Sequence, residues 1–315
     1  MSKSPVQPVL DRRTLLRLAG AAALGGVPLA AKASGPGPVA TKARIVIAGG
    51  GAAGLAVAAR LSRLVTGATI TVVDRRKEHF YQPGFTLVAA GLKPAGYVVS
   101  STAEYIPAGV TLVEERVAEF DPEGNKVVTE SGQALPYDFL VVATGLQLDY
   151  AAIEGMDTAL IGRDGIGSVY AGPEAAEATW REMSRFADTG GVGLFLRPNT
   201  EMKCAGAPLK YTFITDDYLR RRGNRAKAEA LYAANNKSLF SVPIVSEKVR
   251  MLFQDRGVKV AYDHVMTAID PGRKVATFKT PDGPAEIKYD FVNVIPPMRA
   301  PERSEARRVG KERRS

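Results

Sequence analysis

A glycine-rich turn between a strand and a helix is the feature that most constrains the fold. Residues 44–48 form a short apolar run rich in β-branched side chains (RIVIA), which is typical of a buried parallel strand. The run leads directly into residues 49–54 (GGGAAG) and a helical stretch at 55–64, and a second strand at 69–73 ends at Asp74. The order of strand, glycine turn, helix, strand and acid predicts a βαβ unit that binds a dinucleotide.

Each glycine of this turn has a specific task in such a unit. Gly49 allows the tight turn, Gly51 lets the backbone approach a pyrophosphate, and Gly54 lets the helix pack closely on the strand. Asp74 lies 20 residues beyond Gly54, where a carboxylate accepts hydrogen bonds from a ribose hydroxyl. A glycine-rich surface loop is the alternative interpretation, but the flanking elements and the acid at this spacing favour a nucleotide site.

The fingerprint alone does not distinguish FAD from NAD, but the segments that follow it do. Strands of a small inserted sheet are expected at 112–120 and 126–129. A further buried strand at 137–142 ends in a small-residue turn at Thr144 and Gly145. Two-domain flavoproteins bring a similar Ala-Thr-Gly turn close to their FAD, and this likeness predicts FAD as the cofactor.

A second α/β unit follows, but its glycine loop is missing. Strands are expected at 191–197, 228–234 and 258–261, and helices at 208–222 and 242–256. In pyridine-nucleotide reductases such a unit carries a second Gly-rich loop for NAD(P)H. Here the first strand leads into residues 197–204 (RPNTEMKC), where Pro198 removes a backbone N–H and no glycine spacing recurs. A loop carrying a thiol therefore replaces the loop that would hold a nicotinamide dinucleotide.

Cys204 is the one cysteine of the chain, so no disulfide forms within it. A lone cysteine is more often a small buried hydrophobe than a reagent. Here, however, Cys204 precedes a helix N-terminus, Lys203 is its neighbour, and Lys210 is expected in the first turn of that helix. These surroundings favour the thiolate, which is the nucleophilic form. Cys204, Lys203 and Lys210 are the candidate catalytic residues.

The cysteine loop carries a family resemblance. Residues 199–210 (NTEMKCAGAPLK) resemble the active-site loop of the sulfide:quinone oxidoreductases. The likeness recurs in the same order along the chain in segments 79–91, 145–150, 166–170 and 289–298. It covers residues 42 to about 301 and is greatest to the subgroup that includes the mitochondrial enzyme. Bacterial subgroups with a third cysteine would carry it near Gly167 and Ser168, where this chain has none.

The resemblance implies an FAD-dependent enzyme that oxidises sulfide. Cys204 would become a persulfide, a sulfur acceptor would take the sulfur, and the reduced FAD would pass its electrons to a membrane quinone. In the family a second redox cysteine, a further FAD-contacting segment and membrane-seating amphipathic helices all lie C-terminal to the position of Pro301. We therefore expect a chain that ends here to fold but not to turn over.

The resemblance also places residues on the cofactor. It puts Ala52 and Ala53 at the FAD phosphate turn, Asp74 at the ribose, and Gln82 and Val117 against the cofactor. The expected fold is an α/β protein of the glutathione-reductase-like flavoprotein class, with two Rossmann-like (three-layer ββα and βαβ) dinucleotide-binding units and the C-terminal part missing.

The two ends of the chain are expected to lie outside these units. An Arg12-Arg13 pair, a mildly apolar stretch at 18–31 and the small-residue site Ala31-Lys32-Ala33 indicate a twin-arginine export signal and a periplasmic protein, peripheral on the membrane when full length. A disordered basic tail is the alternative. The expected parts are a signal peptide at 1–34, a linker at 35–41, an FAD-binding domain at 42–155, a second Rossmann-like domain with the active-site cysteine at 156–298, and a non-native or frameshifted tail at 302–315.

The net charge of +9 does not indicate a nucleic-acid partner. The first 34 residues carry +4 and the last 14 carry +3, so only +2 remains for the body. A nucleic-acid footprint needs basic residues concentrated on a folded face. His79 and His264 share no ligand spacing with Cys204, so no metal site is expected.

Two alternatives to a sulfide:quinone oxidoreductase stay open. One is the flavoprotein subunit of a periplasmic flavocytochrome c sulfide dehydrogenase, which passes electrons to a cytochrome and often binds its FAD through a cysteine. The segment 82–84 (QPG) offers no cysteine for such a bond. The other is an inactive, truncated flavin-binding fragment.

Overall fold

The computed structural model describes residues 37–301. The expected signal peptide at 1–34 and the expected tail at 302–315 lie outside the described residues. Within the described part, no helix is both long and apolar enough to cross a membrane.

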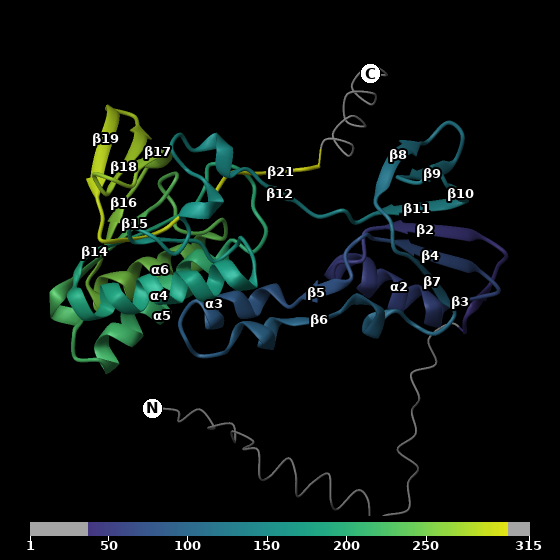
Figure 1. Ribbon diagram of the computed structural model, residues 1–315, viewed down its shortest axis with the longest axis horizontal. Helices are drawn as coiled ribbons and strands as arrows, with labels where there is room; N and C mark the ends of the chain where they lie inside the picture. Colours follow the sequence, from purple (N-terminus) through teal and green to yellow (C-terminus); the bar gives the residue numbers. More distant parts are fainter. Residues whose placement is uncertain (1–36, 302–315) are drawn as a thin grey trace, which may run out of the picture. The chain divides into compact units, whose positions relative to one another are not determined.

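The first sheet is parallel and contains the predicted βαβ unit (Figure 1). Its strand order is β11-β2-β4-β7, formed by Phe139–Val142, Arg44–Ala48, Thr69–Val73 and Val110–Val113. Strands β2 and β4 pair in register from Arg44 opposite Thr69 to Ala48 opposite Val73. Helix α2 (Ala52–Leu64) connects them, so the strands and helix predicted here are confirmed, with the helix starting three residues earlier than expected.

Successive side chains of β2 and β4 point to opposite faces of the sheet and pack into two different apolar layers. Ile47 and Val72 face α2 and pack with its Ala58. Val46 and Val73 face the opposite way. There they pack with an antiparallel sheet of order β10-β9-β8, formed by Ala134–Pro136, Lys126–Thr129 and Val117–Asp121. The result is a ββα arrangement of three layers.

One predicted strand is in fact two. The single strand expected at 112–120 is wrong, because Val110–Val113 (β7) joins the parallel sheet and Val117–Asp121 (β8) joins the antiparallel one. The charged residues 114–116 lie between them, and the N–H of Glu115 bonds the carbonyl of Val113 at 2.9 Å in a tight turn. Because of this turn, residues 110–121 contribute one strand to each of the two sheets.

Strand β11 was expected to be buried, and that expectation is also wrong. It pairs with β2 on one side only and forms the edge of its sheet. Phe139 is 63% exposed and Val142 is 41% exposed. A continuous apolar run predicts a strand but does not distinguish a central strand from an edge strand.

The second sheet is also parallel, in the order β13-β20-β14-β15-β16. Its strands are Ile166–Gly167, Phe291–Asn293, Gly191–Leu196, Ala228–Ala233 and Val258–Ala261. Helix α4 (Pro173–Thr189) packs on β13 and β20, α5 (Gly206–Arg221) on β14 and β15, and α6 (Pro243–Arg256) on β16. The strands and helices predicted here are confirmed to within two residues, whereas α4 was not predicted.

Aromatic rings fill the core of this second unit. Phe186 of α4 stacks on Phe291 of β20 at 5.8 Å between ring centroids, and Phe195 and Tyr211 pack edge-on beside them. The segment 85–98, which lies inside the range expected for the first domain, contributes five buried apolar residues to this same core. Its short helix α3 (Phe85–Val88) contacts α4 and α5.

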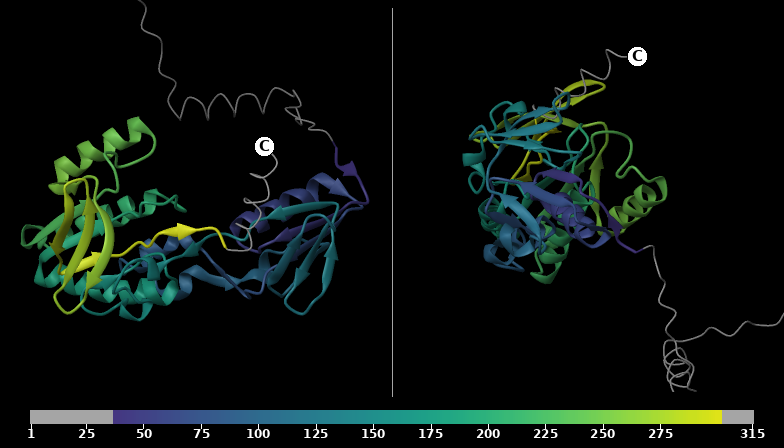
Figure 2. Two further views of the ribbon diagram at one scale, coloured as in Figure 1. Left: turned by 90° about the horizontal axis from the view of Figure 1, so that it is seen from above. Right: turned by 90° about the vertical axis from the view of Figure 1, so that its right-hand side faces the viewer.

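The remaining elements are short. The antiparallel sheet β17-β18-β19, yellow-green to yellow in Figures 1 and 2, is formed by Val265–Asp270, Val275–Thr280 and Gly283–Lys288. Antiparallel pairs join β5 (Glu78–Phe80) to β6 (Val99–Ser101) and β12 (Gln147–Leu148) to β21 (Met298–Arg299). Two further short strands are β1 (Val39–Ala40) and β3 (Val65–Thr66). The 3-10 turns are Gln82–Gly84, Ala95–Val98, Thr102–Tyr105, Tyr150–Ala152, Thr158–Leu160 and Arg225–Lys227.

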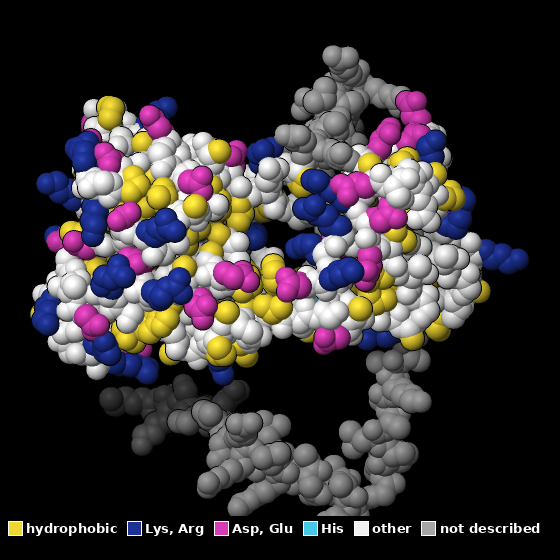
Figure 3. Space-filling model, in the orientation of Figure 1, with side chains coloured by type: hydrophobic (Ala, Val, Ile, Leu, Met, Phe, Trp, Pro, Cys, Tyr) yellow, Lys and Arg dark blue, Asp and Glu magenta, His cyan; other side chains and the backbone are white. Residues whose placement is uncertain are grey.

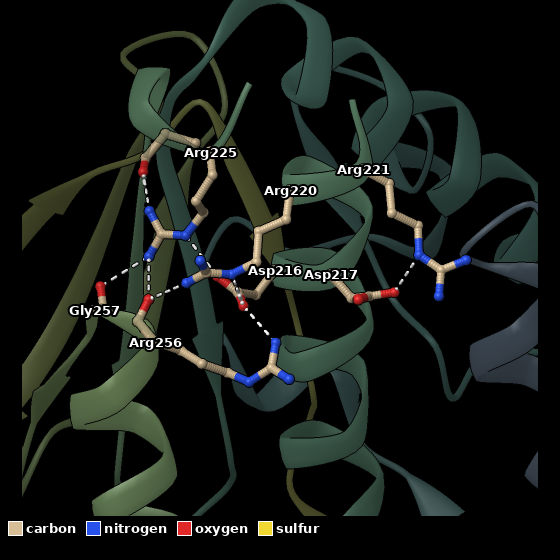
Figure 4. Close-up of polar contacts among 8 residues, drawn as sticks. Asp216, Asp217, Arg220, Arg221, Arg225, Arg256 and Gly257 are labelled. Carbon is tan, nitrogen blue, oxygen red and sulfur yellow. Dashed lines mark hydrogen bonds and ion pairs between the residues drawn. The ribbon is translucent and has the colours of Figure 1, made fainter. Parts of the chain in front are cut away.

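Basic and acidic side chains lie interspersed over the face drawn in Figure 3, in keeping with the near-neutral body of the sequence. One buried charge cluster stands out within the fold. Asp216 of α5 has a side chain that is 0% exposed, and Arg220, Arg225 and Arg256 converge on it (Figure 4). The three nitrogen-to-oxygen distances are 2.9, 2.5 and 2.9 Å.

The Asp216 cluster connects the ends of two helices. Burial acts to raise the pKa of Asp216, but hydrogen bonds from the three guanidinium groups outweigh it and lower that pKa. Arg225 also donates to the carbonyls of Arg256 and Gly257 at the C-terminus of α6. Those carbonyls have no partner within the helix, so the arginines cap it.

Replacing Asp216 by alanine is expected to lower the free energy of unfolding by about 3 kcal/mol, because three guanidinium groups then lose their shared buried carboxylate. Asp217→Ala is the matched control on the same helix. Its ion pair with Arg221 is exposed, and its loss is expected to cost less than about 1 kcal/mol. Urea denaturation followed by circular dichroism measures both variants, and equal losses would contradict a structural role for the Asp216 cluster.

Candidate functional site

The glycine turn brings a helix N-terminus against a strand end. A Cβ atom at Gly54 would lie 1.8 Å from the carbonyl oxygen of Gly49, and one at Gly49 would lie 2.2 Å from the carbonyl oxygen of Ala143. Gly49 also has a φ of +114°, a conformation that other residues rarely adopt. Only glycine fits at these two positions, as the fingerprint predicts.

Gly51 has a different environment. It precedes the first residue of α2, and a Cβ atom there would have only Nη2 of Arg76 within 4 Å, at 3.5 Å. The backbone at this point therefore faces open space. The free N–H groups at a helix N-terminus are suited to bind an anion placed in that space.

Asp74 lies at the end of β4 and supports the same turn. Its Oδ2 accepts the N–H of Gly50 at 2.7 Å, and its Oδ1 accepts the backbone N–H of Arg76 at 2.8 Å. The Arg76 guanidinium pairs with the carboxylate at 3.2 Å. Burial acts to raise the pKa of Asp74, but these hydrogen bonds and the charge of Arg76 outweigh it and lower the pKa. The carboxylate is thus held ionised as a hydrogen-bond acceptor.

A cavity of about 640 Å³ opens over the glycine turn. Ten of the sequence-predicted site residues line it: Gly49, Gly51, Ala52, Ala53, Asp74, Gln82, Val117, Thr144, Gly145 and Lys203. Gly54 does not line the cavity, because it packs beneath the turn. Cys204 and Lys210 do not line it either.

The cavity wall also carries cations that sequence reasoning did not single out. Arg75, Arg76 and Arg116 line it together with Lys203, against the carboxylates of Asp74 and Glu115. The signal for two of them was the Arg75-Arg76 pair directly after Asp74. A surplus of two positive charges matches the two negative charges of a dinucleotide diphosphate. The size, the glycine turn and the charge of the cavity therefore fit FAD.

The cysteine loop joins β14 to α5. Cys204 is exposed, adopts a φ of +50°, and lies one residue before Ala205, the N-cap of α5. Its carbonyl accepts hydrogen bonds from the N–H of Ala207 at 2.9 Å and from the hydroxyl of Tyr170 at 2.8 Å. These bonds fix the backbone on both sides of the thiol. Tyr170 was missed as a site residue, although it lies in segment 166–170, one of the segments that carry the family resemblance.

Lys203 connects the cysteine loop to the cavity. Its Nζ donates to Oε1 of Gln82 at 2.7 Å, and it lies 5.7 Å from the ring centroid of Tyr170. Burial lowers the pKa of Lys203, and the positive charge of Arg76 lowers it further. A lysine made less basic by its surroundings is a candidate for proton transfer.

Lys210 lies further along α5 than expected. The helix begins at Gly206, so Lys210 is in its second turn rather than its first. Its Nζ donates to the carbonyl of Pro83 at 3.1 Å. Both lysines thus bond to the 82–84 segment, and among the described residues Lys210 makes no hydrogen bond to the thiol.

Comparisons with known proteins agree with this geometry. Residues 43–182 match the family described as pyridine nucleotide-disulphide oxidoreductase. The chain is 36% identical over 261 residues to the mitochondrial sulfide:quinone oxidoreductase of Mus musculus, a match that covers 82% of this chain and 57% of that protein. It is 37% identical over 256 residues to the Dictyostelium discoideum protein of the same name, covering 81% and 56%.

A solved structure supports the fold. The X-ray structure of the sulfide:quinone oxidoreductase from Aquifex aeolicus superposes with a TM-score of 0.71 at 22% identity, covering 84% of this chain and 61% of that one. The predicted α/β fold with parallel sheets is confirmed. The chain spans little more than half the length of the curated relatives it matches.

Replacing Gly54 by alanine is expected to destabilise the protein by about 3 kcal/mol or more, because the new methyl group would overlap the carbonyl of Gly49 and force α2 away from the turn. The melting temperature measures this effect. Gly96→Ala is the control, since a Cβ atom there meets nothing within 4 Å. A Gly54→Ala protein as stable as the Gly96→Ala protein would refute the close contact.

Proposed function

We propose that this chain, which belongs to the sulfide:quinone oxidoreductase family, binds FAD in the cavity of about 640 Å³, and that Cys204 accepts the sulfide sulfur when the second redox cysteine of the family is also present, with the electrons passing through FAD to a quinone. The mouse and Dictyostelium relatives are both named mitochondrial sulfide:quinone oxidoreductases. Because the chain covers little more than half of their length, its own activity, substrate and electron acceptor are part of this proposal.

One observation carries the proposal. Lys203 and Cys204 are consecutive residues, and Lys203 reaches the cavity wall at Gln82 while Cys204 is exposed on the same loop. A thiol that is exposed to solvent can meet a small soluble nucleophile. Because Lys203 lines the nucleotide cavity, the thiol of Cys204 is one residue away from a side chain that would face a cofactor bound there.

The chemistry is a two-electron oxidation. The sulfide sulfur and the sulfur of Cys204 join in a new S–S bond, and two protons and two electrons are released from the thiol and hydrogen sulfide. FAD, when bound, supplies the two-electron acceptor. The product is a persulfide on Cys204, from which a nucleophilic acceptor then takes the outer sulfur and restores the thiol.

The protein's own residues hold the reactants and the charge. Tyr170 fixes the carbonyl of Cys204, and the ammonium group of Lys203 provides positive charge beside the loop where sulfide arrives as an anion. The lowered pKa of Lys203 makes its ammonium group easier to deprotonate than that of a free lysine. On the other side of the cavity, Asp74 would accept from the ribose, and Arg76 lies where the diphosphate would sit.

The site of action is a separate part of the proposal. We propose export by the twin-arginine route on the basis of residues 11–33 alone, and peripheral membrane association of the full-length protein. Cell fractionation of the tagged protein tests it, and recovery of all the protein from the cytoplasm would contradict it.

The central test is anaerobic titration with sulfide of the FAD-loaded protein, extended to the full length of its relatives. We expect sulfide to bleach the flavin absorbance of the wild type. Cys204→Ser is expected to slow the bleaching by about a thousandfold or more, because a serine hydroxyl is a far poorer nucleophile than a cysteine thiolate. The exposed Arg181→Gln variant is the control and should bleach like the wild type. Equal bleaching of the wild type and the Cys204→Ser protein would remove the thiol from the mechanism, as would ready reduction by NADH after the thiol has been alkylated.

A further inference from the structure

A second cavity, of about 310 Å³, lies at the C-terminal ends of β14 and β15. Its walls come from two loops, residues 197–205 after β14 and residues 235–241 after β15. Ligands of open parallel sheets bind outside the carboxyl ends of the strands, so this is a position where a site is expected. The cavity shares no lining residue with the larger cavity over the glycine turn.

Two polar atoms in its wall lack partners. Nε of Arg197 and Oδ1 of Asn235 are buried, and neither has a hydrogen-bond partner among the described residues. Such groups are rare in folded proteins, because each one loses its bonds to water without gaining a replacement. Here one is a donor and the other an acceptor, and both belong to residues lining the same cavity.

The charge of Arg197 is also uncompensated. Within residues 37–301 it forms no ion pair, including with Glu201, an exposed residue that lines the same cavity. The charge of Arg197 also acts on two buried phenols near it. Burial raises the pKa of both Tyr170 and Tyr232, and the positive charge of Arg197 opposes that rise in each. A partly buried guanidinium without a counter-ion calls for an anion.

We propose that this cavity binds a small oxyanion, a carboxylate or a sulfonate, that also carries a hydrogen-bond donor. The guanidinium of Arg197 binds the anionic group, and Oδ1 of Asn235 accepts the donor. A nicotinamide dinucleotide does not fit, because Pro198 and the residues after it present no glycine turn and the cavity has about half the volume of the first.

The occupant would contact the loop that holds the thiol. Met202 and Ala205 line this cavity, Lys203 lines the other, and Cys204 lies between them in the chain. The cysteine loop thus forms part of the wall of both cavities. A bound oxyanion would therefore touch residues on either side of the Lys203–Cys204 pair, without depending on whether FAD or sulfide is present.

Isothermal titration calorimetry with three probes tests the inference. Acetate and methanesulfonate distinguish a carboxylate from a sulfonate, and glycolate adds a hydroxyl donor to acetate. We expect at least one of the acids to bind, and glycolate to bind about two- to tenfold more tightly than acetate because its hydroxyl can donate to Asn235.

Two variants identify the site. Arg197→Gln is expected to weaken binding about tenfold or more, since it removes the charged donor. Asn235→Asp provides a second route should Arg197→Gln fold poorly, because the new carboxylate pairs with Arg197 and excludes the probe. Arg181→Gln removes one exposed positive charge and should bind like the wild type.

These binding experiments use neither sulfide nor FAD. Their outcomes therefore test the second cavity separately from the sulfide titration. Loss of binding in Arg197→Gln and Asn235→Asp but not in Arg181→Gln supports the site. Absence of binding by the wild type to all three probes, or equal binding by all variants, overturns it. Tight binding of NADH in a fourth titration, lost in Arg197→Gln and with none of the acids binding, would make the cavity a dinucleotide site and would also overturn it.

Discussion

The close contact between Gly54 and Gly49 is the constraint on which the nucleotide cavity depends. Since neither residue has a side chain, the first turn of α2 lies directly on the end of β2. That approach leaves the backbone around Gly51 facing the cavity, where the helix N-terminus can bind a negative charge. Asp74 then reaches across to the N–H of Gly50 and joins the end of β4 to the same turn. The position of every other group in the first unit is set relative to this junction.

Electrostatics connects that junction to the cysteine loop. Arg76 pairs with Asp74 over the glycine turn, and its charge lowers the pKa of Lys203, which comes from the second unit. Gln82 accepts from Lys203, and it lies on a segment whose neighbours pack into the core of that second unit. A negatively charged cofactor in the cavity would meet both cations at once. A cofactor bound there would therefore influence the surroundings of Cys204 through these charges.

The order of elements could be predicted from the sequence because it rests on local patterns. Apolar β-branched runs located β2, β4, β14, β15 and β16, and the glycine spacing located the cavity. The misses have a different origin. Whether Phe139 is central or at an edge depends on which strand pairs with it, and the division of 112–120 depends on two sheets that compete for one segment. Strand pairing and sheet membership are set by the assembled fold, so the periodicity of apolar residues in the sequence does not predict them.

The site shows the same division between local and assembled features. Lys203 and Cys204 could be identified from their sequence context, whereas the places of Tyr170, Arg116 and Arg197 depend on the fold. Only the folded chain brings Tyr170 to the cysteine loop, Arg116 to the first cavity and Arg197 to the second.

The structure of the second unit also changes how the loss of its glycine loop is understood. In a doubly wound sheet the loop after the first strand normally holds a diphosphate, and glycine is needed because the ligand lies against the backbone. Here residues 197–205 hold side chains toward two cavities, so the loop needs side chains where a dinucleotide site needs none. Arg197 lines one cavity and Lys203 lines the other, so each cavity has a positive charge, and Cys204 directly follows Lys203 on the same loop. A loop built in this way favours an anion at each cavity and carries its thiol directly after one of the two cations.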